Sequence, residues 1–303
     1  MQPFMSHPTT IVPTMEAPPH AALLQIDAAE FRANFNRRPF LIGHHLCDHP
    51  LFTLPSLLEL AQRLPDKNIE YNAGNLPMSL DSQQTPRTGL SIAETIRRIE
   101  ECQSWMVLKY VESDPLYRDL LHQCLSAVRP HSEPLVPGMS QAQAFIFITS
   151  PNSVTPYHMD PEHNFLLQIR GSKSIQQFDG SDRSIVSELE LERSYEGAPR
   201  NLVFKEEYLA KSWSFDLQSG FGLHFPVTYP HWVKNGPSVS ISFSITFRTP
   251  DLERRAMIYN VNSLLRRHGL NPTPVGQSPW KDALKFQAHR TWRRARRLFS
   301  GRV

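Results

Sequence analysis

Hydrophobic and polar residues follow two different periods along this chain, and the change falls near Pro137. Before Pro137, apolar residues recur every three or four positions, which is the spacing of an amphipathic helix. After it, they alternate with polar residues or form short runs that end at Gly, Pro, Asp or Ser, as strands do. The pattern therefore predicts a helix-rich N-terminal part followed by a β-rich part.

Four segments of the N-terminal part carry helical signals. They are DAAEFRANF (27–35), TLPSLLELAQRLP (53–65), SIAETIRRIEEC (91–102) and DPLYRDLLHQCLSAV (114–128). Ser91 and Glu94 have the spacing of a capping box, which satisfies free backbone N–H groups at a helix start. After the first helix, Pro39 marks a break, and FLIGHHL (40–46) is predicted to be a strand.

Five segments after Pro137 are predicted to be strands: AQAFIFITS (142–150), HNFLLQIRG (163–171), KSIQQFDG (173–180), WSFDLQSGFGLHFPV (213–227) and SVSISFSITFRT (238–249). The last alternates Val, Ile and Phe with Ser and Thr, which predicts one buried and one polar face. Short strands without intervening helices favour a sandwich or barrel over a doubly wound sheet. Two amphipathic helices follow, in 251–270 and 279–299.

These patterns divide the chain into four parts. We expect a flexible leader (1–25), a helix-rich part that packs on the core (26–136), a β core (137–250), and C-terminal helices with a basic tail (251–303). The fold class is thus mainly β with flanking helices.

Composition narrows the class of protein. Apolar residues make up 40% of the 303 residues, which is enough for a substantial core. No run of 18 apolar residues occurs, so we expect no membrane span, and the N-terminus lacks the features of a secretory signal. Three widely separated cysteines (Cys47, Cys102 and Cys124) fit reduced thiols. We therefore expect a cytoplasmic protein.

The net charge of +3 is unevenly distributed, because residues 281–303 carry eight basic side chains against one acidic one, Asp282. Such a tail can meet nucleic acid, anionic lipid or an acidic partner. A solvated helical surface explains it equally well. Nucleic acid is thus a candidate partner that rests on the tail alone.

The stretch TPYHMDPEHNFLLQIRGSK (155–173) places ionisable residues inside a strand-like segment. In an extended chain His158 and Asp160 point the same way, so both can bind one ion. A second histidine, His231, lies in FPVTYPHWVKNG. Two histidines and one carboxylate are the ligand set of non-haem Fe(II) oxygenases, which leaves positions open for a cosubstrate. Since the imidazoles must be neutral, we expect metal affinity to fall as the pH drops through the histidine range.

Lys173 is predicted on the neighbouring strand, where a buried ammonium needs an anionic partner. A dicarboxylate cosubstrate would be one, and the Thr155 hydroxyl could donate to the same carboxylate. A solvent-facing Lys173 is the alternative on spacing alone. Arg248, at the end of the alternating strand, is a second candidate for the anchor.

These motifs resemble those of the jumonji-C or cupin-like 2-oxoglutarate oxygenases, and especially of the asparaginyl hydroxylase that acts on hypoxia-inducible factor. The residues that carry the resemblance are Thr155, Pro156, His158, Asp160, Asn164, Phe165, Gln168, Ile169, Gly171 and Lys173, together with the segment around His231 and RRPFLIG (37–43). The likeness covers roughly residues 30 to 250.

The resemblance implies a double-stranded β-helix (jelly-roll or cupin) core with Fe(II) and 2-oxoglutarate as cofactors. It implies His158, Asp160 and His231 as iron ligands, and Thr155 and Lys173 as the holders of the distal carboxylate of 2-oxoglutarate. Residues expected near the metal or the substrate are Asn164, Tyr157, His163 and Asn235. The activity implied is hydroxylation of a protein, peptide or amino-acid side chain. By position, the C-terminal helices resemble a dimerisation appendage, which implies a homodimer.

Other histidines are assigned other roles. His44, His45 and His49 with Cys47 and Asp48 resemble a metal cluster, but zinc sites usually need two spaced ligand pairs, so we interpret this segment as an exposed loop. His163 is expected to line the pocket entrance or contact substrate. His224 stands where the family commonly has an aromatic or aliphatic residue, and we expect it to be buried and hydrogen-bonded.

A second function remains open at this point. A cupin-like regulator could bind a small ligand, or nucleic acid through the basic tail, without turnover. The complete set of His158, Asp160, His231 and Lys173 favours the enzyme, because a protein that only binds a ligand has no need of open metal positions.

Overall fold

The computed structural model describes residues 10–11, 23–80 and 85–300 of the chain. Its helices are α1 (Ala28–Asn34), α2 (Leu54–Arg63), α3 (Ile92–Arg97), α4 (Pro115–Ser132), α5 (Glu188–Tyr195), α6 (Pro250–Arg267) and α7 (Pro279–Ser300). Its strands are β1 (Thr10–Ile11), β2 (Leu24–Gln25), β3 (Phe40–His44), β4 (Ile69–Ala73), β5 (Ser104–Lys109), β6 (Ser140–Thr149), β7 (Val154–His158), β8 (His163–Arg170), β9 (Ser172–Phe178), β10 (Ser212–Gln218), β11 (Phe221–Phe225), β12 (His231–Asn235) and β13 (Ser240–Arg248). Of the leader predicted for residues 1–25, only β1 and residues 23–25, which include β2, are among the described residues.

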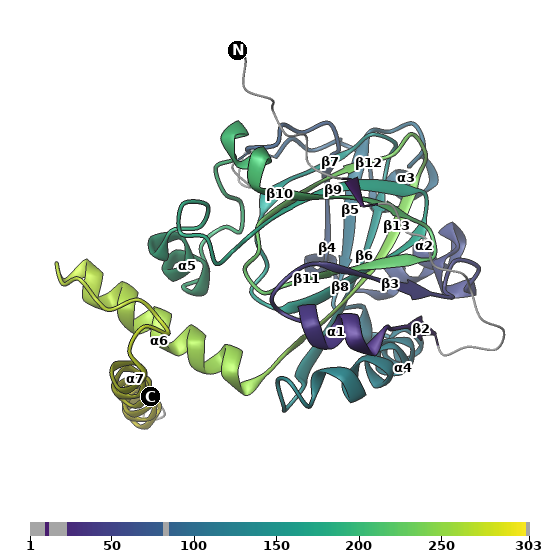
Figure 1. Cartoon of the computed structure of the whole chain (residues 1–303). Coiled ribbons are helices and arrows are strands. Elements are labelled where there is room, and N and C mark those ends of the chain that lie inside the picture. The colour runs from purple at the N-terminus through teal and green to yellow at the C-terminus, as the bar shows by residue number, and fades with distance from the viewer. Residues whose placement is uncertain (1–9, 12–22, 81–84, 301–303) are drawn as a thin grey trace, which may run out of the picture.

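The described strands form two sheets that face each other (Figure 1). One sheet has the order β1-β10-β9-β12-β7, and the other has the order β2-β3-β11-β8-β13-β6-β5-β4. All pairs are antiparallel except β1 with β10. This is the double-stranded β-helix with flanking helices, so the predicted fold class is confirmed.

Helices cover the outer face of the eight-stranded sheet. Phe31 of α1, Leu57 of α2 and Tyr117 of α4 belong to one buried cluster with outward-facing strand residues such as Phe165 and Phe243. Local sequence fixes where these helices begin. The Asp27 side chain accepts hydrogen bonds from two backbone N–H groups at the start of α1, and the capping box predicted at Ser91 is present in α3.

Two features of the structure were not predicted from the sequence pattern. β4 and β5, which lie in the part predicted to be helix-rich, extend the eight-stranded sheet. Helix α5 lies between β9 and β10, where no helix was expected, and begins with a capping box at Ser187. The sheet therefore draws strands from both sides of residue 137.

The polar face of β13 is buried rather than solvated. Ser242 donates to Gln168 Oε1 at 2.7 Å and Ser244 donates to Asn164 Oδ1 at 2.8 Å, across the β8–β13 pair. Its apolar face joins the cluster under the helices. In β13 the period of two therefore separates an apolar face under the helices from a polar face between the sheets.

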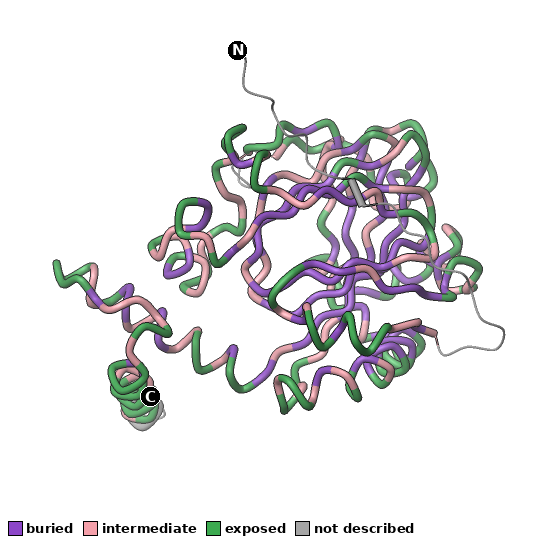
Figure 2. Tube along the Cα trace, viewed as in Figure 1, coloured by how far each residue is buried: buried purple, intermediate pink, exposed green. Residues whose placement is uncertain are grey.

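The C-terminal helices lie apart from the sheets (Figure 1). α6 follows β13 and packs on α5, where Arg266 binds the fully buried carboxylate of Glu192 at 2.8 and 3.1 Å. α7 packs on α6 and is mostly exposed (Figure 2). No helix within the described ranges has the length and apolar character needed to cross a membrane.

Candidate metal centre

Two strands of the five-stranded sheet bring the predicted ligands together. His158 ends β7 and pairs with His231, which begins β12, and their ring centroids are 4.2 Å apart. Asp160 follows two residues after His158, and its Oδ2 lies 3.9 Å from His231 Nε2. One ligand atom from each of the three residues lies within 4.8 Å of the others. Among the described residues, this is the one group of three or more such side chains that could share an ion.

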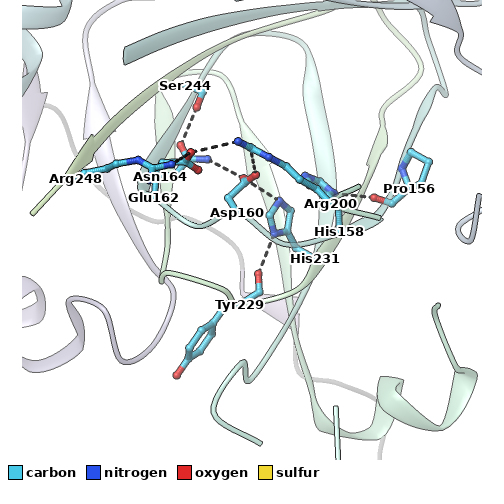
Figure 3. A network of polar contacts seen from close by, with 10 residues as sticks. All are labelled: Pro156, His158, Asp160, Glu162, Asn164, Arg200, Tyr229, His231, Ser244 and Arg248. Atoms are coloured by element: carbon cyan, nitrogen blue, oxygen red, sulfur yellow. Dashed lines mark hydrogen bonds and ion pairs between the residues drawn. The ribbon is translucent and has the colours of Figure 1, made fainter. Parts of the chain in front are cut away.

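Backbone contacts orient both imidazoles. His158 Nδ1 lies 2.7 Å from the carbonyl oxygen of Pro156, and His231 Nδ1 lies 3.1 Å from that of Tyr229 (Figure 3). When Nδ1 donates to these carbonyls, Nε2 carries the lone pair that a metal needs. The chain therefore fixes the tautomer of both rings before any ion binds.

The charge states also suit a divalent cation. Burial raises the pKa of Asp160, but His158, Arg200 and His231 outweigh this effect and lower it to about 2. Burial, with a smaller contribution from His158, lowers the pKa of His231 to about 3. A carboxylate and a neutral imidazole are thus present at neutral pH. This donor set fits Fe(II), or another divalent ion that accepts two nitrogens and one oxygen.

A β-bulge explains how Thr155 and His158 line the same cavity. Three residues separate them, so a regular strand would point them to opposite faces. In β7 the register shifts between the two, since His158 pairs with His231 and Thr155 pairs with Val233. Both side chains therefore line the cavity. Bulges of this kind commonly re-aim a side chain beside an active site.

Lys173 extends into the same interior from β9. Its side chain is 4% exposed, and no carboxylate of the described residues forms an ion pair with its Nζ. The Phe147 ring centroid lies 6.0 Å from Nζ. Burial lowers the pKa of Lys173 to about 7. A solvent-facing Lys173 is therefore ruled out.

A cavity of about 360 Å³ joins these groups. Lys173 and Thr155 line it together with all three candidate metal ligands. Its other walls include aromatic residues of β5 and β6, among them Trp105 and Phe147, whose rings are 5.9 Å apart. Trp105 Nε1 donates to Thr155 Oγ1 at 3.0 Å, which leaves the Thr155 hydroxyl proton free to donate.

Comparison with known proteins supports the fold. No family model and no curated protein matches the sequence. Among solved structures, the chain is similar to the X-ray structure of Escherichia coli ycfD, with 14% identity, a TM-score of 0.52, and alignment over 88% of this chain and 67% of that one. This chain shares the YcfD fold. A YcfD structure described as a ribosomal oxygenase in complex with cobalt and 2-oxoglutarate matches with 14% identity and a TM-score of 0.49, over 84% and 61% of the two chains. The chain spans 60% to 67% of the YcfD chains that it matches.

Four further residues were expected near the metal or the substrate. Asn164 lies there, because its Nδ2 faces Asp160 Oδ2 at 3.5 Å and it lines the cavity. Asn235 does not line the cavity, because it lies four residues after His231 at the other end of β12, where its amide donates to Thr149 Oγ1 at 2.6 Å. Tyr157 is buried on the outer face of the sheet, against Phe178.

His163 does not lie where we expected it. Its ring is fully buried between Phe35 and Phe247, with centroids 5.0 and 4.9 Å away, and it does not line the cavity. Odd-numbered residues of β8 face the helices, which is the reason for the difference. His224 is buried and hydrogen-bonded, as expected. Its Nδ1 lies 3.1 Å from Asn164 O, and its Nε2 accepts from Asn36 N at 3.1 Å.

The histidine-rich loop does not assemble a metal site among the described residues. His44 is buried, with Nε2 2.9 Å from the Gln168 carbonyl oxygen, whereas His45 is exposed. Arg248, the alternative carboxylate anchor, donates to Glu162 at 2.8 Å and does not line the cavity. Of the two candidates, Lys173 is the one inside the cavity.

Two charged residues of the site were missed from the sequence. Arg200 donates to Asp160 Oδ1 at 2.7 Å and to Glu162 Oε1 at 3.2 Å (Figure 3). Arg200 lies in an irregular segment 40 residues after Asp160, where no motif marks it. Glu162 does carry a signal, because its even spacing from His158 and Asp160 puts it on the same side of the chain.

Proposed function

We propose that this protein is an Fe(II)- and 2-oxoglutarate-dependent oxygenase that hydroxylates a protein, peptide or amino-acid side chain. The observation that carries the proposal is one cavity that holds two histidines, one carboxylate and a buried lysine without a carboxylate partner among the described residues. A metal ion needs the first three groups, and an anionic cosubstrate needs the fourth.

The residues take distinct roles in this proposal. His158, Asp160 and His231 hold the metal, and Asn164 orients Asp160 from the side of β8. Lys173 pairs with the distal carboxylate of 2-oxoglutarate, and Thr155 donates a hydroxyl hydrogen bond to it. When bound, the two cofactors supply the oxidative chemistry, in which O₂ converts 2-oxoglutarate to succinate and CO₂ and hydroxylates a C–H bond. The sheets around the cavity exclude water from that reaction.

A side chain presented by a larger molecule fits the cavity. The wall built by β4, β5 and β6 combines Trp105, Phe145 and Phe147 with an ion pair between Glu70 and Lys109. Such a wall can pack against a substrate side chain and hold polar groups beside it. YcfD, which shares the fold, is described as a ribosomal oxygenase, which supports a protein substrate.

The direct test is succinate production from 2-oxoglutarate by the purified protein with Fe(II), ascorbate and air, without an added substrate. We expect slow uncoupled turnover that is lost in Asp160→Ala. Asp216→Ala is the matched control, because Asp216 lies on β10 and does not line the cavity. A thermal shift with 2-oxoglutarate, run in parallel, reports binding independently of turnover.

Turnover in the wild type and in Asp216→Ala, but not in Asp160→Ala, would establish an oxygenase. Binding of 2-oxoglutarate without any turnover would favour the alternative function of a ligand-binding regulator. The absence of both binding and turnover would refute the proposal.

We also propose that two copies of the chain associate through α6 and α7. The large apolar side chains of Trp280, Leu284 and Trp292 on α7 are exposed, and association of two copies would bury them. Light scattering of a variant with all three residues replaced by Ala tests this. A wild-type dimer that becomes a monomer is expected, and a dimer that survives would contradict the proposal.

A further inference from the structure

Arg200 joins the candidate metal ligand Asp160 to a second buried carboxylate (Figure 3). Its Nη1 donates to Asp160 Oδ1 at 2.7 Å, and its Nη2 donates to Glu162 Oε1 at 3.2 Å. The two carboxylates are 15% and 6% exposed, whereas the arginine side chain is 50% exposed. Two largely buried carboxylates thus hold one half-exposed guanidinium.

The two oxygens of Asp160 face different groups. Oδ1 accepts from Arg200, while Oδ2 faces Asn164 Nδ2 at 3.5 Å and His231 Nε2 at 3.9 Å. Oδ2 therefore lies on the side of His231. A carboxylate can bind a metal through one oxygen or both, and a hydrogen bond to the second oxygen disfavours the second mode.

The position of Arg200 is itself fixed from another part of the chain. Glu162 Oε1 also accepts from Arg248 Nη2 at 2.8 Å, and Arg248 is the last residue of β13. Arg200, for its part, lies in the segment that follows α5. The planar fork of Arg200 can therefore reach both carboxylates at once, which the single ammonium of a lysine cannot do as well.

We propose that Arg200 is a positioning residue that holds Asp160 Oδ1 and so restricts Asp160 to binding a metal through Oδ2 alone. This inference rests on the proposed function, because it assigns Arg200 a role only if the three ligands hold an ion. An octahedral ion held by three protein atoms keeps three open positions. An aspartate that binds through both oxygens would leave two, which a chelating 2-oxo acid would fill completely.

The experiment counts water ligands on Mn(II) bound to the full-length protein without cosubstrate. Pulsed electron paramagnetic resonance in labelled water measures this number. The variants are Arg200→Met, which removes both hydrogen bonds, and Arg200→Lys, which keeps a positive charge that can donate to Asp160. Arg63→Met is the matched control, because Arg63 is also half-exposed and pairs with a buried carboxylate, that of Asp114, which is not one of the candidate metal ligands.

We expect three water ligands in the wild type, in Arg63→Met and in Arg200→Lys, and two in Arg200→Met. We also expect the kcat of uncoupled 2-oxoglutarate turnover to fall by about 10-fold or more in Arg200→Met, with a smaller change in KM. Three waters in Arg200→Met would overturn the inference while leaving the proposed function intact.

Failure of the wild type to bind Mn(II) would instead count against the proposed function. If Arg200→Met does not fold, as judged by circular dichroism, Arg200→Gln provides the second test. Its shorter, neutral side chain removes the guanidinium from Asp160 Oδ1 but stays polar, so two waters are expected. Three waters in a folded Arg200→Gln would then overturn the inference.

Discussion

Replacement of Lys173 by Met should make the protein more stable and at the same time abolish cosubstrate binding. Lys173 is 4% exposed and has no carboxylate partner among the described residues. Burial lowers its pKa from 10.5 to about 7. At about 1.36 kcal/mol per pKa unit, the charged form is disfavoured by about 5 kcal/mol in the folded state. We expect Lys173→Met to recover about 2 to 5 kcal/mol at pH 6.5, because relaxation around the charge reduces the full value.

The sign of the pH dependence follows from the same pKa. Between pH 7 and pH 10.5 the unfolded chain keeps a proton on Lys173 that the folded chain has lost, so the stability of the wild type rises with pH across this window. Lys173→Met lacks this dependence. The difference in unfolding free energy between the two proteins should therefore shrink above pH 7 and vanish near pH 10.5.

Urea unfolding at several pH values measures the difference, with Lys234→Met as the control, since Lys234 is an exposed lysine on the neighbouring strand β12. A thermal shift with 2-oxoglutarate should be clear in the wild type and in Lys234→Met but lost in Lys173→Met, with binding weakened by about 100-fold or more. A folded Lys173→Met that is no more stable than the wild type at pH 6.5, or that still binds 2-oxoglutarate, would refute the reasoning.

Three other predictions concern the candidate metal ligands and the core. The pKa values of Asp160 and His231 are lowered to about 2 and about 3, so both groups are already deprotonated at pH 6 and Mn(II) binding should release at most one proton. Calorimetry in two buffers with different ionisation enthalpies measures this number, and a release of two or more protons would contradict the prediction. Phe31→Ala should cost about 3 to 5 kcal/mol in urea unfolding, since the Phe31 ring is fully buried, and a cost below about 1 kcal/mol would count against its place in the core. Arg266→Met should cost about 3 kcal/mol at pH 7, because the buried carboxylate of Glu192 loses its partner, and an unchanged urea midpoint would be the contrary result.

The low pKa of His231 also revises one expectation from the sequence. Metal affinity was expected to fall as the pH drops through the usual histidine range. Burial keeps His231 neutral to about pH 3, so this ligand does not contribute to such a fall. Depth of burial is a tertiary property, and a motif of three residues contains no information about it.

Two of the three candidate metal ligands were accessible from the sequence because their spacing follows from local geometry. His158 and Asp160 are two residues apart at the end of a strand, and strong alternation marked β13 and hence the sheet around them. The glycine turn at Gly171, which separates β8 from β9, placed Lys173 on the neighbouring strand, but spacing alone left a solvent-facing side chain open. At Gly171 φ is +74°, a conformation that favours glycine.

Other features arise from contacts between distant segments. The bulge in β7 appears only when β7 pairs with β12, and without it Thr155 would point away from the cavity. Arg200 reaches Asp160 from a loop that has no periodic pattern, so spacing could not indicate it. Strands β4 and β5 are short, and pairing rather than composition makes them part of the sheet, since β4 pairs with β5 and β5 pairs with β6.

The side chains that face the cavity from the five-stranded sheet lie in rows across the strands, and this arrangement fixes the distance between the candidate anchor and the candidate metal ligands. Gln177 pairs with His231 in the row of the metal ligands, and Lys173 lies four residues earlier on the same strand. Four residues of β-strand span about 13 Å, which separates the backbone of the anchor from the backbone of the metal row. Within the proposed function, the space between the Lys173 side chain and the candidate metal ligands limits the length of a cosubstrate that can contact both. The rise of a strand thereby favours a dicarboxylate whose length matches this separation.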